Sequence, residues 1–285
     1  MDSLVLSGGG VKGYVYIGII IQLFKKDLIR HIKNFSGTSI GAIFCLLLII
    51  NFTDKEIYNL FINFNIVKLK EFSYTNILTD ELWGFNKINN LMETLKLCMK
   101  YKHIDPNITF HELNKKFNVN FYIVATSLVK FTEKCFSNKS TPNIKVLDAI
   151  RASINLPILF NKFSLNDEYL IDGGFTNNFP IEYLITKESD ENNTKILGIC
   201  IEDEKNNSSN DLKVNTILDY IYLLLKGIYI NYGRFQRQKL EFYKNNENIK
   251  IYKIKLNSSK ISTIKFDISI KDKLNMIKIG YNTIN

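Results

Sequence analysis

The sequence is poor in cysteine and histidine, with four and three residues of these types among 285. The cysteines lie far apart and form no Cys-x-x-Cys pair, and no cluster of histidines accompanies them. This spacing argues against a disulfide framework and a zinc site, so we expect no metal and no cofactor. Free, buried thiols in a reducing compartment are the simplest expectation for Cys45, Cys98, Cys135 and Cys200.

The sequence also lacks a long hydrophobic run. The longest, residues 42–50, is far shorter than the ~20 residues that span a bilayer. The apolar stretch at 217–230 is interrupted by Asp219 and Lys226. The N-terminus has no cationic segment of the kind that opens a signal peptide. We therefore expect a soluble cytoplasmic protein, at most peripheral to membranes.

The net charge of +9 is carried by scattered lysines, and no basic block typical of a nucleic-acid-binding arm is present. We expect no nucleic-acid partner, and the sequence indicates no oligomeric state. A solvated surface accounts for the charge, and a surface that faces anionic lipid is the alternative. Heavy use of Asn, Ile and Lys indicates an AT-rich organism or a large DNA virus.

Aromatic and basic residues of the C-terminal third have two interpretations. They belong either to an interfacial face or to a helix that packs in the core. The residues concerned are Tyr220, Tyr222, Tyr229, Tyr232 and Arg234.

Short apolar runs alternate with segments of helical periodicity along the chain. Strands are predicted at 4–6, 121–125, 132–136, 169–171, 196–201 and 249–255, and a further short strand is predicted to end at Phe35. Helices are predicted at 14–28, 42–50, 53–64, 87–101, from a start capped by Thr109 and Glu112, at 146–153 and at 216–240. The alternation favours an α/β fold of three α/β/α layers with a mainly parallel central sheet. We expect a catalytic domain over 1–204 and a C-terminal extension, 205–285, packed on the same domain.

The first glycine-rich motif spans residues 8–13 and follows a predicted strand. Glycines in this position let backbone N–H groups converge on an anion, either a phosphate or the oxyanion of acyl transfer. The motif also fits G-x-G-x-x-G, but the acidic residue that binds a dinucleotide ribose is absent near Asn34 and Phe35. The motifs of a kinase or of a P-loop do not follow either.

The second motif is Gly37-Thr38-Ser39-Ile40-Gly41, between a predicted strand and an apolar helix. In this context G-x-S-x-G predicts a sharp turn that exposes a nucleophilic serine. The flanking glycines allow the turn, and the helix that follows directs its N-terminus toward Ser39. A serine nucleophile needs a neighbouring base to take its proton.

The third motif, Asp172-Gly173-Gly174, follows a predicted strand and supplies the best-placed base. In a Ser-His-Asp hydrolase of this type the histidine follows the acid along the chain. None of the three histidines, His31, His103 and His111, lies after Asp172. A turn-forming role is the simpler alternative for Asp172. If Asp172 does not merely form a turn, it is the residue expected to take the proton of Ser39.

Together the three motifs resemble those of the patatin-like phospholipases, a family of lipid acyl hydrolases. Similar segments lie between and after them, at 125–127, 150–153, 156–160 and 178–180. The resemblance covers about residues 3–186 and implies a Ser39–Asp172 dyad that cleaves lipid esters through an acyl-enzyme. It implies an oxyanion-binding loop of Gly8, Gly9, Gly10, Val11, Lys12 and Gly13, and flanking glycines Gly37, Gly41, Gly173 and Gly174.

The resemblance implies a phospholipase A or lysophospholipase, with phospholipid or another lipid ester as substrate and possible contact with an anionic membrane. Lys12 would orient the loop or meet a phosphate headgroup. The alternative function is a catalytically weak or inactive patatin-like protein that binds lipid or nucleotide.

Overall fold

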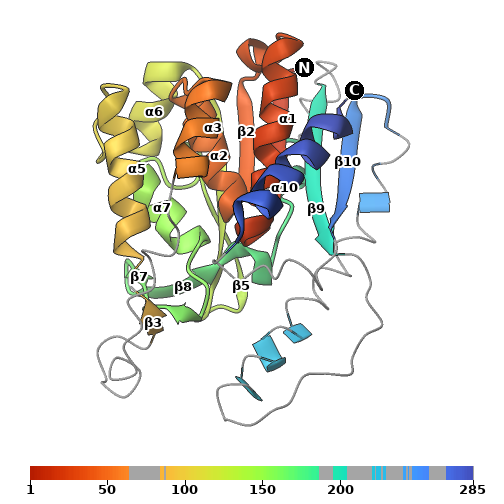
Figure 1. Ribbon diagram of the computed structural model, residues 1–285. Coiled ribbons are helices and arrows are strands. Elements are labelled where there is room, and N and C mark those ends of the chain that lie inside the picture. The colour runs from red at the N-terminus through yellow and green to blue at the C-terminus, as the bar shows by residue number, and fades with distance from the viewer. Residues whose placement is uncertain are drawn as a thin grey trace.

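A mixed sheet organises the part of the chain that the computed structural model describes (Figure 1). That part comprises residues 1–63, 84–86, 88–185, 195–203, 246–256 and 268–284, with short stretches between 220 and 243. The strand order is β10-β9-β1-β2-β4-β8-β7, and β5 pairs with β4. The five strands from β10 to β4 are parallel, whereas β5, β7 and β8 are antiparallel to their neighbours. The predicted α/β class with a mainly parallel sheet is therefore confirmed.

The strands have the following bounds: β1 Ser3–Leu6, β2 Asn34–Thr38, β4 Asn120–Ser127, β5 Thr132–Phe136, β7 Ser164–Leu165, β8 Glu168–Asp172, β9 Ile196–Asp203 and β10 Ile249–Leu256. A separate parallel pair joins β3 (Gly84–Asn86) to β6 (Ile158–Phe160). The helices are α1 Tyr14–Lys25, α2 Ile40–Ile49, α3 Asp54–Asn63, α5 Asn89–Tyr101, α6 Phe110–Phe117, α7 Val146–Ser153 and α10 Ile270–Thr283. At the start of α6, the predicted capping box between Thr109 and Glu112 is present.

Alternate side chains of the strands enter two apolar clusters, one on each face of the sheet. Leu4 and Leu6 of β1 belong to the large cluster beneath the helices, and Val5 belongs to the smaller one. Figure 1 shows the labelled helices gathered over one face. Within the described residues, the opposite face is covered by the turn Ile181–Tyr183 and by Leu240. This alternation is the expected pattern of a sheet buried on both sides.

The C-terminal part departs from the sequence analysis in one element. Helix α10 was not predicted, yet it packs closely against α1. A side chain at Gly18 would overlap the backbone of Ile277, and one at Gly280 would overlap the carbonyl of Val15. The close approach of these two backbones therefore depends on glycine. The predicted helix at 216–240 lies mostly outside the described residues.

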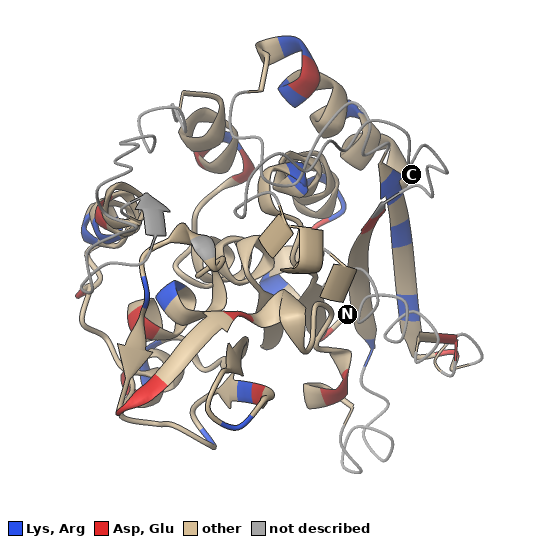
Figure 2. Ribbon diagram, turned by 90° about the horizontal axis from the view of Figure 1, so that it is seen from below, with Lys and Arg blue, Asp and Glu red and all other residues tan. Residues whose placement is uncertain are grey.

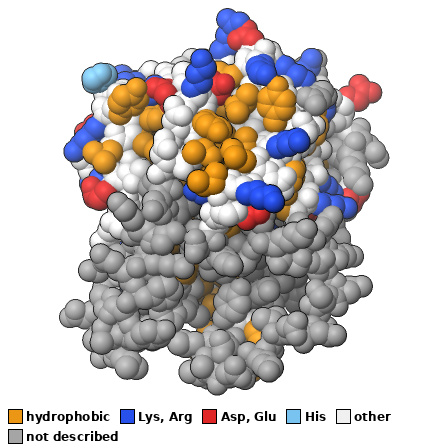
Figure 3. Space-filling view, viewed as in Figure 1, with side chains coloured by type: hydrophobic (Ala, Val, Ile, Leu, Met, Phe, Trp, Pro, Cys, Tyr) orange, Lys and Arg blue, Asp and Glu red, His pale blue; other side chains and the backbone are white. Residues whose placement is uncertain are grey.

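The expectation of free cysteines is met, although Cys135 is only half-buried. In the part of the chain that the structure describes, no helix is both long and apolar enough to cross a membrane. Basic and acidic residues are interspersed over the ribbon in Figure 2. In Figure 3, lysines and arginines surround apolar side chains on the helical face.

Candidate active site

The sharp turn predicted around Ser39 joins β2 to α2. Ser39 has φ 53° and ψ −126°, a conformation that costs free energy for a residue with a side chain. The turn also needs glycine on its far side, because a side chain at Gly41 would overlap the carbonyl oxygens of Leu6 and Ser7 at the end of β1. Gly37 lies in β2, in register with Leu6. The β2–α2 turn thus places Ser39 at the carboxyl ends of the parallel strands.

Asp172 reaches the same place from the opposite direction. It ends β8, which runs antiparallel to β4 and pairs Asp172 with Ala125. Since β2 lies on the other side of β4, with Thr38 opposite Val124, the two motifs meet across that strand. Ser39 Oγ donates a hydrogen bond of 2.6 Å to Asp172 Oδ2. The fold thus brings together two residues that lie 133 positions apart in the sequence.

The Asp172 carboxyl group is buried but has polar neighbours. It is 2% exposed, and the backbone N–H of Gly174 donates a 2.7 Å hydrogen bond to its other oxygen, Oδ1. Burial raises its pKa from 3.8 to about 6, although the hydrogen bonds from Ser39 and Gly174 oppose the rise. Such a carboxylate is ionised at neutral pH and is still basic enough to accept a proton. Gly173 and Gly174 belong to the short 3-10 turn after β8.

A residue whose role the sequence analysis missed, Ser153, holds the backbone of the β2–α2 turn. Its Oγ accepts a 2.8 Å hydrogen bond from the N–H of Ser39 and donates one of 2.5 Å to the carbonyl of Val124. Ser153 is fully buried at the end of α7. The Arg-Ala-Ser segment of the sequence contains this residue, but no local pattern reveals a hydrogen bond to a residue 114 positions away.

The glycine-rich loop after β1 lies beside this turn. A side chain at Gly8 would overlap Asn178 and lie 3.4 Å from Ser39 Cβ. Two backbone N–H groups of the loop are already used, since Gly8 donates to Asn178 O and Lys12 donates to Gly9 O. Those of Gly9, Gly10 and Val11 have no acceptor among the described residues. The structure thus divides the six predicted loop residues into positions that brace the loop and positions whose N–H groups can bind an anion.

Backbone conformation and packing explain two further glycines of the loop. Gly10 has φ 53°, which favours glycine. A side chain at Gly13 would come within 2.5 Å of Ile40. Lys12 is only 1% exposed. This burial is at odds with contact between Lys12 and a lipid headgroup, so of the two expected roles the structure favours orientation of the loop.

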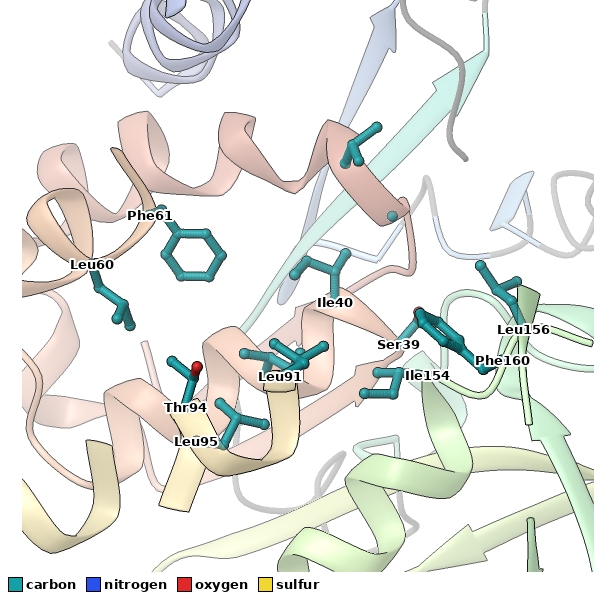
Figure 4. A pocket seen from close by; sticks show the side chains of 13 residues that line it. Ser39, Ile40, Leu60, Phe61, Leu91, Thr94, Leu95, Ile154, Leu156 and Phe160 are labelled. Carbon is teal, nitrogen blue, oxygen red and sulfur yellow. The ribbon is translucent and has the colours of Figure 1, made fainter. Parts of the chain in front are cut away.

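An apolar cavity opens directly beside Ser39 (Figure 4). Its volume is about 90 Å³, which accommodates part of one hydrocarbon chain rather than a whole lipid. Apart from Ser39, Thr94 is the one hydroxyl-bearing residue among the described residues of its lining. The remaining lining residues are Gly10, Val11, Ile40, Ile43, Leu60, Phe61, Leu91, Leu95, Ile154, Leu156 and Phe160.

The three histidines take no part in this arrangement: all are exposed, away from the buried Ser39–Asp172 pair. The site combines a hydroxyl hydrogen-bonded to a carboxylate, three N–H groups that have no acceptor in the described part of the chain, and an apolar cavity. Chemically, such a set can move a proton from an attacking hydroxyl, stabilise an oxyanion and accommodate an apolar chain.

Comparison with known proteins agrees with this geometry. The family model described as patatin-like phospholipase matches residues 4–185. The chain therefore belongs to the patatin-like phospholipase family, as its motifs predicted.

The chain has viral relatives. It is 32% identical over 204 residues to the probable lipid hydrolase 463L of invertebrate iridescent virus 6, covering 68% of this chain and 66% of that protein. It is 27% identical over 292 residues to the uncharacterized protein R571 of Acanthamoeba polyphaga mimivirus, covering 100% and 92%. Both relatives fit the expectation of a large DNA virus as source.

The fold is also found in a solved structure. The crystal structure of VipD from Legionella pneumophila matches with a TM-score of 0.60 at 19% identity. The match covers 99% of this chain and 66% of VipD. The chain thus spans about two thirds of the length of VipD and of the iridescent virus protein.

Proposed function

We propose that this protein is a lipid acyl hydrolase of the phospholipase A or lysophospholipase type, with Ser39 as nucleophile and Asp172 as base. The observation that carries the proposal is the 2.6 Å hydrogen bond from Ser39 Oγ to Asp172 Oδ2 at the mouth of an apolar cavity. The raised pKa of Asp172 supports its role, because a base is most effective when its pKa lies near the working pH.

In the first half of the reaction, Ser39 Oγ attacks the ester carbonyl and Asp172 takes the hydroxyl proton. The carbonyl oxygen becomes an oxyanion, which the N–H groups of Gly9, Gly10 and Val11 stabilise. The tetrahedral intermediate collapses as the C–O bond to the alcohol breaks. Asp172 returns the proton to the departing alkoxide, and the acyl group stays on Ser39.

In the second half, a water molecule attacks the acyl-enzyme and gives its proton to Asp172. Collapse of the second tetrahedral intermediate releases the fatty acid, and Ser39 Oγ recovers the proton. The strained turn contributes by holding Oγ clear of the backbone, so that both attacks start from one geometry.

Chemical labelling and kinetics test this proposal. A fluorophosphonate probe is expected to label wild type at Ser39, and Ser39→Ala is expected to lower kcat on phospholipid and p-nitrophenyl esters by about 10⁴-fold or more. Ser140→Ala, a change at an exposed serine, is the matched control. Full activity in Ser39→Ala or Asp172→Asn would overturn the pair. Binding of lipid or nucleotide without turnover or labelling would favour the inactive alternative.

We also propose contact with anionic membranes, through the tip of the β4–β5 hairpin. Thr38 and Val124 lie in register, and β4 then continues to Ser127, about 10 Å further along the strand. The tip therefore projects past the edge at which Ser39 lies. It exposes Val129 and Phe131, the latter 82% exposed, with Lys130 between them. Apolar side chains beside a lysine are suited to a lipid interface.

Co-sedimentation tests the membrane proposal. Wild type is expected to pellet with phosphatidylglycerol vesicles more than with phosphatidylcholine vesicles, and Phe131→Ser is expected to weaken pelleting severalfold. Equal pelleting of both proteins would remove the hairpin tip from the proposal. Of the aromatic and basic residues that the sequence analysis considered for this role, Tyr220 is 52% exposed, and the other four lie outside the described residues.

A further inference from the structure

The cavity beside Ser39 has a definite far end. Its lining begins at Ser39 and passes Ile40 and Ile43 on one side of α2. Leu60 and Phe61, in the last turn of α3, close it on the side opposite Ser39 (Figure 4). An acyl chain attached to Ser39 would therefore run along α2 with its terminal methyl group toward α3.

The aromatic ring at this end is fixed by its neighbours. Phe61 stacks on Phe44, with ring centroids 4.6 Å apart and planes 12° apart. Tyr14 meets the same ring edge-on, with centroids 6.1 Å apart, and its hydroxyl donates a 3.2 Å hydrogen bond to the carbonyl of Phe61. Phe44 and Tyr14 are themselves buried. Both the ring and the backbone of Phe61 are thus held, so an incoming chain meets a rigid wall.

The position of Phe44, on which Phe61 stacks, indicates how far the end of the cavity lies from Ser39 along α2. Phe44 follows Ser39 by five residues, which corresponds to about 7.5 Å along a helix axis. An extended hydrocarbon chain covers that distance with about six carbons. The small cavity volume of about 90 Å³ agrees with a chain of limited length.

We infer that Phe61 is a specificity-determining residue that ends the acyl site and restricts the enzyme to acyl chains of medium length. The inference rests on the proposed hydrolase function and deepens it, because it names the acyl group that the site takes. The chemical class follows from the lining: an unbranched, unsubstituted hydrocarbon chain, since among the described residues that line the cavity Thr94 offers one hydroxyl and none carries a charge.

A chain-length series of p-nitrophenyl esters, from acetate to palmitate, tests the inference. Each methylene that enters an apolar cavity is expected to raise kcat/KM about fourfold. In wild type the rise is expected to stop near six to eight carbons. In Phe61→Ala the rise is expected to continue, so that the ratio of kcat/KM for decanoate to that for hexanoate increases about tenfold or more.

Two features of the design separate specificity from damage to the fold. A ratio between two esters measured on the same variant does not depend on how much of that protein is folded. Phe61→Leu retains apolar packing against Phe44 and is expected to shift the ratio by less. Phe117→Ala makes the same chemical change in α6, outside the cavity, and is expected to keep the wild-type ratio.

The outcomes also separate this inference from the proposed function. Ester hydrolysis that depends on Ser39 but has the same chain-length limit in Phe61→Ala would overturn the inference and leave the function intact. If wild type showed no ester hydrolysis that depends on Ser39, the proposed hydrolase function would be overturned. Calorimetric binding of fatty acids to Ser39→Ala then reports on the cavity without turnover, and equal gains in affinity up to palmitate would overturn the length limit independently.

Discussion

Lowering the pH is the most direct perturbation of the Ser39–Asp172 pair, because only the ionised carboxylate can take the hydroxyl proton. Burial raises the pKa of Asp172 to about 6. With that pKa, about half of the carboxyl groups are ionised at pH 6 and about one in eleven at pH 5. With the ordinary pKa of 3.8, more than about nine in ten would still be ionised at pH 5.

We therefore expect kcat/KM for a soluble ester to fall about twofold at pH 6 and about tenfold at pH 5, relative to pH 8. The kcat/KM profile reports the free enzyme, so it follows the pKa of Asp172 before substrate binds. Nitrophenol released from p-nitrophenyl butyrate is measured after each sample is brought to one alkaline pH. Product ionisation then does not enter the profile.

Circular dichroism at each pH and recovery of the rate on return to pH 8 distinguish titration from unfolding. A midpoint near pH 4 would refute the argument that burial governs the basicity of Asp172. A midpoint near 6 that persists in Asp172→Asn would assign the titration to another group.

Three further predictions concern stability and positioning. Asp172→Asn is expected to raise the free energy of unfolding at pH 8 by about 3 kcal/mol, from a pKa of 3.8 unfolded and about 6 folded. Wild type loses stability as its buried carboxyl group ionises, that is, as pH rises through 6. The free-energy gain of Asp172→Asn should therefore vanish near pH 4 in urea titrations. A gain that does not change with pH would contradict the prediction. Ser153→Ala leaves the N–H of Ser39 unpaired and is expected to lower kcat about 10- to 100-fold, with little change in KM. Ser153→Thr is expected to restore part of this kcat. A variant that loses only thermal stability would show that the role of Ser153 is structural. Gly280→Ala forces a side chain against the Val15 carbonyl and is expected to cost about 3 kcal/mol in urea denaturation. Gly227→Ala adds a side chain in open space on a helical segment and is expected to cost nothing, or to gain up to about 1 kcal/mol. Equal midpoints for the two variants would refute the close packing of α1 and α10.

Local patterns were sufficient to predict most of the fold. Apolar runs such as 121–125 lie in a buried strand, and the capping pair of Thr109 and Glu112 starts α6 as expected. Helix α10 escaped detection for a physical reason. It buries few apolar side chains and relies on backbone contact at Gly280, which leaves no periodic signal in the sequence.

The site likewise has a part that local sequence patterns predict and a part that they do not. Ser39 and Asp172 each follow a strand and are flanked by glycines, so their neighbourhood was predictable. The contribution of Ser153 and the end of the cavity at Phe61 arise from contacts between distant segments. The sequence around Ser153 and Phe61 contains no pattern that predicts these contacts, so they become visible only in the folded structure.

The position of β1 has a consequence for how the protein is made. This strand, which leads into the glycine-rich loop, lies between β2 and β9, and α1 is covered by α10. During synthesis β1 thus waits about 190 residues for β9, and α1 waits about 255 residues for α10. We expect folding dominated by such distant contacts to be slow and to finish after synthesis. The nascent chain would then carry Ser39 beside a glycine-rich loop that is not yet ordered, and we expect hydrolysis to begin only once α10 has docked on α1.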